Sequence, residues 1–312
     1  MPDIVIEQAI FGSQAPVGYR FLASSPGFLE QWLPWAQRLC AGFGERPAGV
    51  ACPECVLAQP FGRGHVAVVQ VADLGADDTG RPGALGFRLL VMPRAAYRDL
   101  VGDPFAVAER LPPSWEARGQ IPALSWPAEP LPPRTVGQVQ AVLQRPDGPT
   151  LLGGVQALVD GGRLVFERPA PDRGLIGGLW TLLPTSTRHD LWPASFAFGN
   201  ALRFHALVVP RAAGDAYAGY VSEQQTENYP QGRYELNLQI AAEAGDQREL
   251  DSLLARRSRA QMWRLGLTLL AVVVILAMLA GLLAPPAPER RNVPPPSSKT
   301  PADKPAPVEK PR

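Results

Sequence analysis

Three cysteines and one histidine are the first residues in this sequence whose types and spacing suggest chemistry. Cys52 and Cys55 form a Cys-x-x-Cys pair, with Cys40 before it and His65 after it. Structural zinc takes four ligands in a tetrahedral array, and these side chains could supply three thiolates and one imidazole. One such pair with two loosely spaced partners is a weak pattern, and prolines and glycines surround it where a redox motif would open a helix. We therefore interpret it as two small residues in a loop, and predict no metal and no cofactor.

A second set of residues could in principle perform acyl transfer. His189 and Asp190 lie in the sequence near Ser186 and Ser195. However, adjacent His and Asp side chains do not point at one another in regular structure, and the sequence contains no G-x-S-x-G elbow. It also contains no Walker A loop and no H-E-x-x-H motif. We predict no catalytic residue.

A few polar residues stand out near turns and strand ends as candidates for ligand binding. Each of them could equally satisfy backbone groups, which is the more common role of such residues. The candidate binding residues are Gln8, Ser24, Asp78, Arg81 and Arg188. If the chain has an unrecognised enzyme site, these residues would be the first ones to mutate.

The patterns around these residues predict an α+β fold, with hairpins of a mixed sheet and packed helices. Residues 4–11 and 19–23 flank a Gly- and Pro-containing turn, and residues 65–73 and 83–92 flank A-D-D-T-G-R-P-G, so each pair predicts a β-hairpin. Aromatic and aliphatic residues at three- and four-residue spacing predict a helix within 26–44.

The second part of the globular sequence alternates between helix and strand patterns. Seven prolines between residues 112 and 133 indicate an irregular connection and a boundary, giving predicted halves 1–133 and 134–240. Apolar runs around Gly199-Asn200 predict a tight hairpin of residues 192–198 and 202–209. The remaining predicted elements are helices at 135–143, 150–160 and 175–183 and a strand at 163–167.

Two segments of the sequence resemble each other, which we call the internal echo, and they raise the question of a duplication within the chain. FRLLVMPRAA at residues 87–96 and FHALVVPRAA at residues 204–213 share seven of ten positions. Both segments predict a strand that runs into a proline-started helix. Two related halves would explain the echo, as would coincidence in a chain rich in Ala, Leu, Val and Pro.

The sequence after residue 240 predicts a membrane anchor. Residues 241–264 are charged and helix-prone, and residues 265–284 contain no charge and no proline over twenty positions. A helix of that length spans the roughly 30 Å hydrocarbon core of a bilayer. The tail, residues 285–312, has ten prolines in twenty-eight residues and is predicted to be disordered.

The charge balance and the N-terminal sequence give predictions about the binding partners and the cellular location. Thirty Lys and Arg nearly balance twenty-nine Asp and Glu, which argues against binding to nucleic acid. The first residues lack the basic and apolar stretches of a signal peptide. We expect a single-pass protein of the cytoplasmic (inner) membrane, with its N-terminal domain cytoplasmic and its tail on the other side.

Short motifs across residues 4–210 resemble a known family. They are E-Q-A-I-F-G at residues 7–12, G-Y-R-F-L-A-S-S-P at 18–26, D-T-G-R-P-G at 78–83, and a later pattern of Leu183-Pro184, Arg188 and Ser195-Phe196. They resemble the N-terminal domain of the bacterial GTPase-associated protein one family. The resemblance implies a role beside a GTPase in bacterial signalling or conflict systems and implies no enzymatic activity.

These expectations combine into a predicted function. We expect a membrane-anchored, non-enzymatic adaptor whose partners are a GTPase or other signalling protein and the lipid bilayer. Two alternatives stay open: an enzyme with an unrecognised site in residues 1–210, and an envelope protein that acts through its proline-rich tail.

Overall fold

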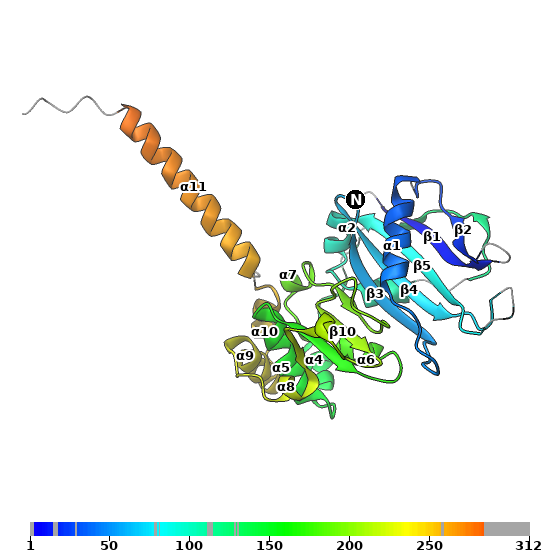
Figure 1. Cartoon of the computed structure of the whole chain (residues 1–312). Helices are drawn as coiled ribbons and strands as arrows, with labels where there is room; N and C mark the ends of the chain where they lie inside the picture. The colour runs from blue at the N-terminus through cyan, green and yellow to red at the C-terminus, as the bar shows by residue number, and fades with distance from the viewer. Residues whose placement is uncertain are drawn as a thin grey trace, which may run out of the picture. The chain divides into compact units, whose positions relative to one another are not determined.

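The computed structural model describes residues 3–14, 18–28, 30–77, 80, 82–110, 115–127, 129, 131–256 and 259–283. The chain divides into two compact units, Met1–Trp263 and Arg264–Arg312. The first unit holds a mixed sheet with packed helices, which confirms the predicted combination of strands and helices (Figure 1). Eleven strands are hydrogen-bonded in this sheet among the residues described. Asp78 and Arg81, two of the predicted binding residues, lie outside these ranges.

The first part of the sheet is an antiparallel meander, which we call the antiparallel region (residues 3–127). Its five long strands lie in the order β3-β4-β5-β1-β2. Both predicted hairpins are confirmed, since Ala9 pairs with Ser24 and Val68 pairs with Leu90. The strands are β1 (Ile4–Gln14), β2 (Gly18–Ser24), β3 (Glu54–Phe61), β4 (His65–Asp73) and β5 (Leu85–Pro93).

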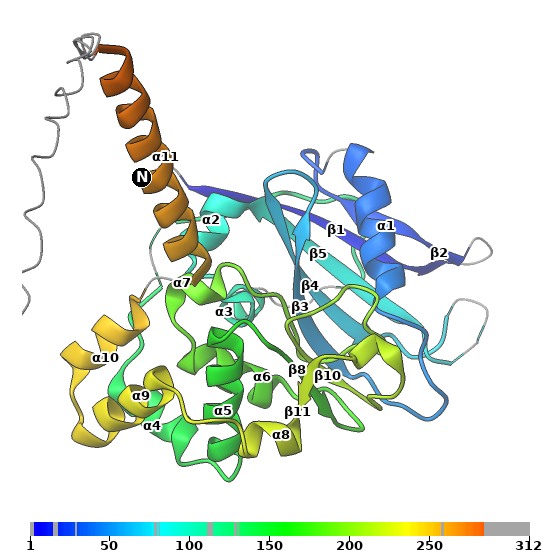
Figure 2. The same ribbon diagram turned by 60° about the vertical axis from the view of Figure 1, so that its left-hand side comes forward.

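Helix α1 (Leu33–Gly42) covers this antiparallel sheet in both views (Figures 1 and 2). A short 3-10 turn, Glu30–Trp32, precedes it, and Pro34 fits its first turn, where a missing N–H costs nothing. Ala36, Leu39 and Cys40 face the core. The predicted helix is therefore present but starts later than its apolar pattern suggests.

The second part of the sheet is parallel, and we call it and its helices the parallel region (residues 131–256). Strand β10 (Ala206–Val209) pairs in parallel with β8 (Arg163–Glu167) and with β9 (Pro193–Ala194), and β11 (Tyr220–Ser222) pairs in parallel with β8. The predicted hairpin of residues 192–198 and 202–209 is wrong for this reason. The chain loops back before β10 and then runs alongside β9 in the same direction.

A single antiparallel contact joins the two parts of the sheet, because Leu57 of β3 pairs with Ala194 of β9. The sheet therefore continues across the predicted boundary near residue 133. Ser195 reinforces the join: its hydroxyl accepts a hydrogen bond from the Val56 N–H at 2.9 Å. At the end of the antiparallel region, β6 (Gly119–Gln120) pairs with β2 and β7 (Leu124–Trp126) pairs with β1.

The helices of the parallel region begin and end close to their sequence signals. Thr135 and Gln138 form a reciprocal capping box at α4, and Gly245 ends α9 with a positive φ of 69°. Figures 1 and 2 both show α4, α5, α8 and α9 grouped together, and α5 and α8 contact β8. The helices are α4 (Val136–Leu143), α5 (Gly148–Val159), α6 (Arg173–Leu182), α7 (Thr185–Arg188), α8 (Glu223–Glu227), α9 (Arg233–Ala244) and α10 (Gln247–Leu254).

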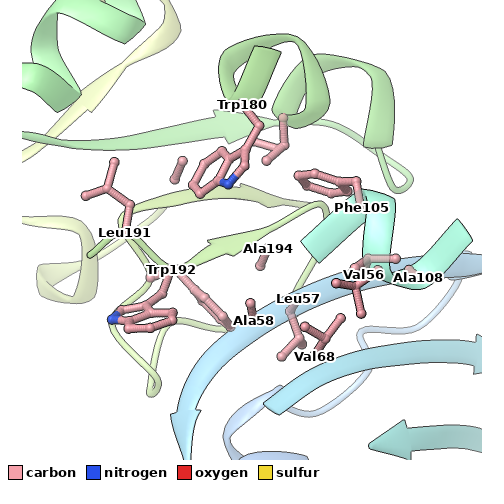
Figure 3. Close-up of a cluster of buried hydrophobic side chains, with 14 of the residues drawn as sticks. Val56, Leu57, Ala58, Val68, Phe105, Ala108, Trp180, Leu191, Trp192 and Ala194 are labelled. Atoms are coloured by element: carbon pink, nitrogen blue, oxygen red, sulfur yellow. The ribbon is translucent and has the colours of Figure 1, made fainter. Parts of the chain in front are cut away.

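Apolar side chains from both regions share one core at the join (Figure 3). Trp180 of α6 is fully buried, its ring meets Phe105 edge-on with centroids 6.2 Å apart, and its Nε1 donates to the Gly102 carbonyl at 3.1 Å. Phe105 belongs to α3 (Pro104–Glu109), which follows α2 (Arg94–Asp99). The two regions therefore exclude water together at this contact.

The internal echo does not produce two equivalent elements. The first copy forms β5, which is antiparallel to its neighbours and leads into α2. The second copy forms β10, which is parallel to its neighbours, and residues 210–213 are not helical. The prediction of a proline-started helix is correct after Pro93 and wrong after Pro210, where a 3-10 turn (Asp215–Tyr217) comes later.

Helix α11 (Arg259–Leu283) begins in the last residues of the first unit and forms the described part of the C-terminal unit. Helix α10 ends at Leu254 and is separate from it, so residues 241–264 form the end of α9, α10 and the start of α11 rather than one helix. Among the residues that the structure describes, no helix combines enough length and apolarity to cross a membrane. Side chains of α11 are described from 266 to 279, and the predicted span of 265–284 stays a prediction.

Candidate functional site

Five arginines line one cavity of about 900 Å³ in the first unit. The wall comes from α3 of the antiparallel region, from the connection at residues 131–134, and from α4, α6 and the end of α7. Two carboxylates, Asp103 and Glu109, lie in the same wall. The arginines are Arg110, Arg134, Arg145, Arg173 and Arg188.

Arg188 is the most deeply buried of these arginines, with 2% of its surface exposed. It contacts Asp103, with Nη1 3.3 Å from the carboxylate, and the same carboxylate caps α3 by accepting from the Phe105 and Ala106 N–H groups. Burial lowers the pKa of Arg188, while Asp103 opposes that shift. Its Nε is buried without a hydrogen-bond partner among the described residues. Arg188 thus lines the cavity and has one buried N–H that is unpaired among the described residues.

Arg134 closes the C-terminal end of α6. Its guanidinium donates to the carbonyls of Thr181 at 2.8 Å and Leu183, and to the Thr185 hydroxyl at 2.9 Å. These are carbonyls that a helix end leaves unsatisfied. Burial, followed by the nearby charge of Arg188, lowers the pKa of Arg134 to about 9, so it remains cationic at pH 7.

The other three arginines are nearer to solvent. Arg145 holds Asp147 with both guanidinium arms, at 2.9 and 2.6 Å, and Arg173 meets Glu109 at 2.9 Å. Arg110 lies over the Trp126 ring, 5.3 Å from its centroid. Because the Glu109 side chain is 69% exposed, its pair with Arg173 is a weak one that solvent screens.

Glycines of α6 create the space in front of the arginines. Gly174, Gly177 and Gly178 all line the cavity. A Cβ at Gly177 would meet nothing within 4 Å, whereas a Cβ at Gly178 would lie 3.1 Å from Leu151 and 3.2 Å from Arg145. Side chains at these positions would occupy the cavity or crowd its wall. The arrangement can therefore hold an anionic group against several guanidinium donors.

The predicted binding residues are not brought together by the described structure. Gln8 is buried in β1, where its amide donates to the Pro122 carbonyl at 2.6 Å and its oxygen accepts from Arg88 at 2.7 Å. The Ser24 carbonyl accepts from the Ile121 N–H at 3.0 Å. Both residues thus hold the 119–122 segment against the sheet, and Arg188 belongs to the cavity.

His65 lies apart from the Cys52–Cys55 pair, at the other end of the β3–β4 hairpin. In the β3–β4 hairpin, Cys55 pairs with Val71 and His65 pairs with Phe61, six residues further along, or about 20 Å of strand. Within the described part of the chain, no three His, Cys, Asp or Glu side chains are grouped as metal ligands. Cys55 lies in strand β3, so the predicted loop is wrong at this position.

The thiols are buried. The Sγ atoms of Cys52 and Cys55 are 3.9 Å apart, and burial raises the pKa of the Cys55 and Cys40 thiols. A raised thiol pKa disfavours the reactive thiolate. These cysteines therefore contribute to packing in the antiparallel region.

The serines, His189 and Asp190 do not assemble into a triad. Ser195 binds Val56, Ser186 donates to the Arg256 carbonyl, and Asp190 pairs with Arg94 at 2.8 Å. Burial, with the charge of Arg98, lowers the pKa of His189. Ser186, Ser195 and Asp190 are engaged in contacts that stabilise the fold, whereas Nε2 of His189 is buried without a hydrogen-bond partner among the described residues.

Sequence reasoning identified one of the five arginines. The other four are spread from position 110 to position 173 and follow no motif. Two signals in the sequence could have pointed to the cavity. One is the Asp103-Pro104 helix start, and the other is the glycines of RGLIGG at residues 173–178. Each glycine inside a helix costs about 1 kcal/mol relative to alanine, which indicates a packing or functional reason for it.

Comparison with known proteins adds no family. No protein-family model matches this chain, and no curated protein matches it. The resemblance to the GTPase-associated protein one family stays a prediction from short motifs.

Proposed function

We propose that this chain is a non-enzymatic adaptor whose folded unit binds a GTPase or another signalling protein of a bacterial signalling or conflict system. In this proposal residues 265–284 anchor the adaptor in the cytoplasmic membrane, with the folded unit on the cytoplasmic side. Confinement to a membrane raises the encounter rate of weakly binding partners without adding contacts.

The surface of α11 is the observation that supports this proposal most. Every described side chain from residue 266 to residue 279 is exposed, and Thr268 is the polar one among them. The exposed fraction runs from 43% at Val274 to 65% at Met278 among its large apolar side chains. Because exposed apolar surface costs about 25 cal/mol per Å² in water, a helix of this kind favours an apolar environment.

The enzyme alternative depended on a concave site that gathers the five predicted polar residues. In the described structure Gln8 and Ser24 support the 119–122 segment, whereas Arg188 lines the cavity. This separation favours the adaptor over that particular site.

A membrane-fractionation experiment tests the anchor. Val273→Lys combined with Leu276→Lys would place two charges near the centre of the predicted span, at about 3 kcal/mol each. We expect the unmodified chain in the membrane fraction and the charged variant in the soluble fraction. Val273→Leu with Leu276→Val is the matched control and should remain in the membrane. Recovery of the unmodified chain in the soluble fraction would refute the anchor.

Affinity purification from solubilised membranes tests the partner. Tagged full-length chain should recover a GTPase, and the yield should differ between added GTP and added GDP. A variant that lacks residues 285–312 should recover the same partner, because the proposal assigns no role to the tail. Loss of the partner upon tail deletion would instead support the envelope alternative.

A further inference from the structure

We propose that the arginine-lined cavity is a binding site for a small organic phosphate, recognised through its phosphate dianion. This inference is independent of the adaptor proposal, since it concerns a ligand of the folded unit and needs neither the anchor nor a GTPase.

The balance of guanidinium and carboxylate groups in the cavity wall indicates the charge of a ligand that would fit it. Three of the five guanidiniums have a carboxylate partner: Arg188 has Asp103, Arg173 has Glu109 and Arg145 has Asp147. Arg110 and Arg134 form no ion pair within the described ranges. Among the described residues, the arginines of the wall therefore outnumber their carboxylate partners by two. A phosphate monoester at neutral pH carries close to two negative charges, because its second pKa is about 6.

The hydrogen-bond donors of the wall also fit a phosphate group. Arg188 lines the cavity and its buried Nε has no partner among the described residues, so a ligand that reached it would satisfy a donor that otherwise costs free energy. Arg173 can exchange the exposed Glu109 carboxylate for a ligand, because a solvent-exposed ion pair is weak. Arg134 contributes a fixed charge, since its donors hold the end of α6.

Apolar groups beside the arginines indicate that the phosphate carries an organic substituent. Phe105, Leu131, Pro132 and Val142 line the cavity together with the arginines. The volume of about 900 Å³ lies within the size range of small-molecule sites and exceeds what one inorganic ion fills. A phosphorylated ring or short chain would use both kinds of wall.

Calorimetric titration of the full chain in detergent with phenyl phosphate and with inorganic phosphate tests the site. We expect saturable binding of phenyl phosphate at one per chain, weaker binding of inorganic phosphate, and no binding of phenol. Equal binding of the two phosphates would overturn the organic-ligand assignment, and absence of both would overturn the site.

Variants locate the binding. Arg110→Gln and Arg173→Gln should each weaken phenyl phosphate binding about 10- to 100-fold, the loss expected for one charge-assisted hydrogen bond. Gly177→Leu should abolish binding by filling the open space while leaving the arginines in place. Arg248→Gln, on the exposed part of α10, is the matched control and should bind as the unmodified chain does. Unchanged binding in Arg110→Gln, Arg173→Gln and Gly177→Leu, with circular dichroism showing intact folds, would overturn the proposal.

Discussion

The antiparallel and parallel regions are parts of one sheet, but they differ in how consecutive strands are connected. In the antiparallel region β1 pairs with β2 and β3 pairs with β4 through short connections. In the parallel region β8 pairs with β10 although helices α6 and α7 lie between them in the chain. Parallel pairing requires such crossovers, whereas antiparallel strands can be joined by a tight turn.

The two regions also differ in where their buried polar groups lie. The antiparallel region uses Gln8 and Arg88 to fix a connecting segment within its own sheet. The arginine cavity instead draws Asp103 and Glu109 from α3 and most of its guanidiniums from the parallel region. The candidate site therefore requires that both regions be folded and packed against each other, because each region supplies only part of the cavity wall.

Replacement of Trp180 by Ala tests most strongly whether the regions unfold as one. We expect a loss of about 3–5 kcal/mol of unfolding free energy, because a fully buried tryptophan leaves a cavity and the Gly102 carbonyl keeps the Tyr97 hydroxyl but loses the indole N–H as a donor. All three cysteines lie in the antiparallel region, so their reaction with a thiol reagent reports on that region alone. Thiol exposure and circular dichroism should change at the same denaturant concentration.

A conservative control variant and a contradicting result complete this test of cooperative unfolding. Trp180→Phe keeps a ring in the core and should lose less stability than Trp180→Ala. Thiols that remain protected while the helical signal is lost would show that the antiparallel region folds independently, which would break the picture of one cooperative unit.

Asp103→Asn removes the charge pair that links the regions and keeps the helix cap, because asparagine caps as well as aspartate does. We expect a loss of about 3–5 kcal/mol, since Arg188 would remain buried without its carboxylate. Chemical denaturation measures the change. Asp147→Asn is the control at a half-exposed pair with Arg145 and should cost about 1 kcal/mol or less. Equal losses in the two variants would contradict the special role of the Asp103 pair.

Acid should destabilise the parallel region through His205. Burial and the charge of Arg163 lower the pKa of His205 to about 4, and its Nδ1 accepts from the Trp192 N–H at 3.1 Å. The unfolded chain protonates this ring near pH 6.5, so the unfolded state binds more protons between about pH 6.5 and 4. Stability is therefore lost as the pH falls through this window, by about 3 kcal/mol at most.

Denaturation at pH 7, 5.5 and 4 measures this loss. His205→Asn keeps an acceptor near the Trp192 N–H and cannot be protonated in this range, so its stability should fall less steeply with acid. An equally steep fall in the variant would assign the acid sensitivity to other groups.

The smallest changes in stability are expected for alanine substitutions at two glycines in helices of the parallel region, and they test how these helices pack. Gly153→Ala would place a Cβ 1.9 Å from the Thr226 carbonyl oxygen, so we expect a loss of about 1–3 kcal/mol from a forced shift of α8 against α5. Gly137→Ala, in α4, meets nothing within 4 Å and should gain about 0.4–1 kcal/mol. Melting temperatures of the two variants should move in opposite directions, and a shift in the same direction would contradict the packing of α8 on α5.

The sequence by itself determined elements whose signals are local. Runs rich in Val, Leu and Phe on either side of turn residues identified the β4–β5 hairpin, and the helix predicted at 135–143 corresponds to α4. These signals succeed because backbone geometry at turns and helix ends depends on neighbouring residues.

Only the tertiary structure decided which strands pair at a distance and which charges meet. The apolar runs on either side of Gly199-Asn200 fit a hairpin as well as a parallel crossover, and contacts with β8 and β3 select the latter. The same holds for the cavity. Arg110 and Arg188 are seventy-eight positions apart in the sequence, and they line one wall because α3 packs against α6 through Phe105 and Trp180. Burial and electrostatic pairing act between residues that are close in space, and sequence spacing does not encode that proximity.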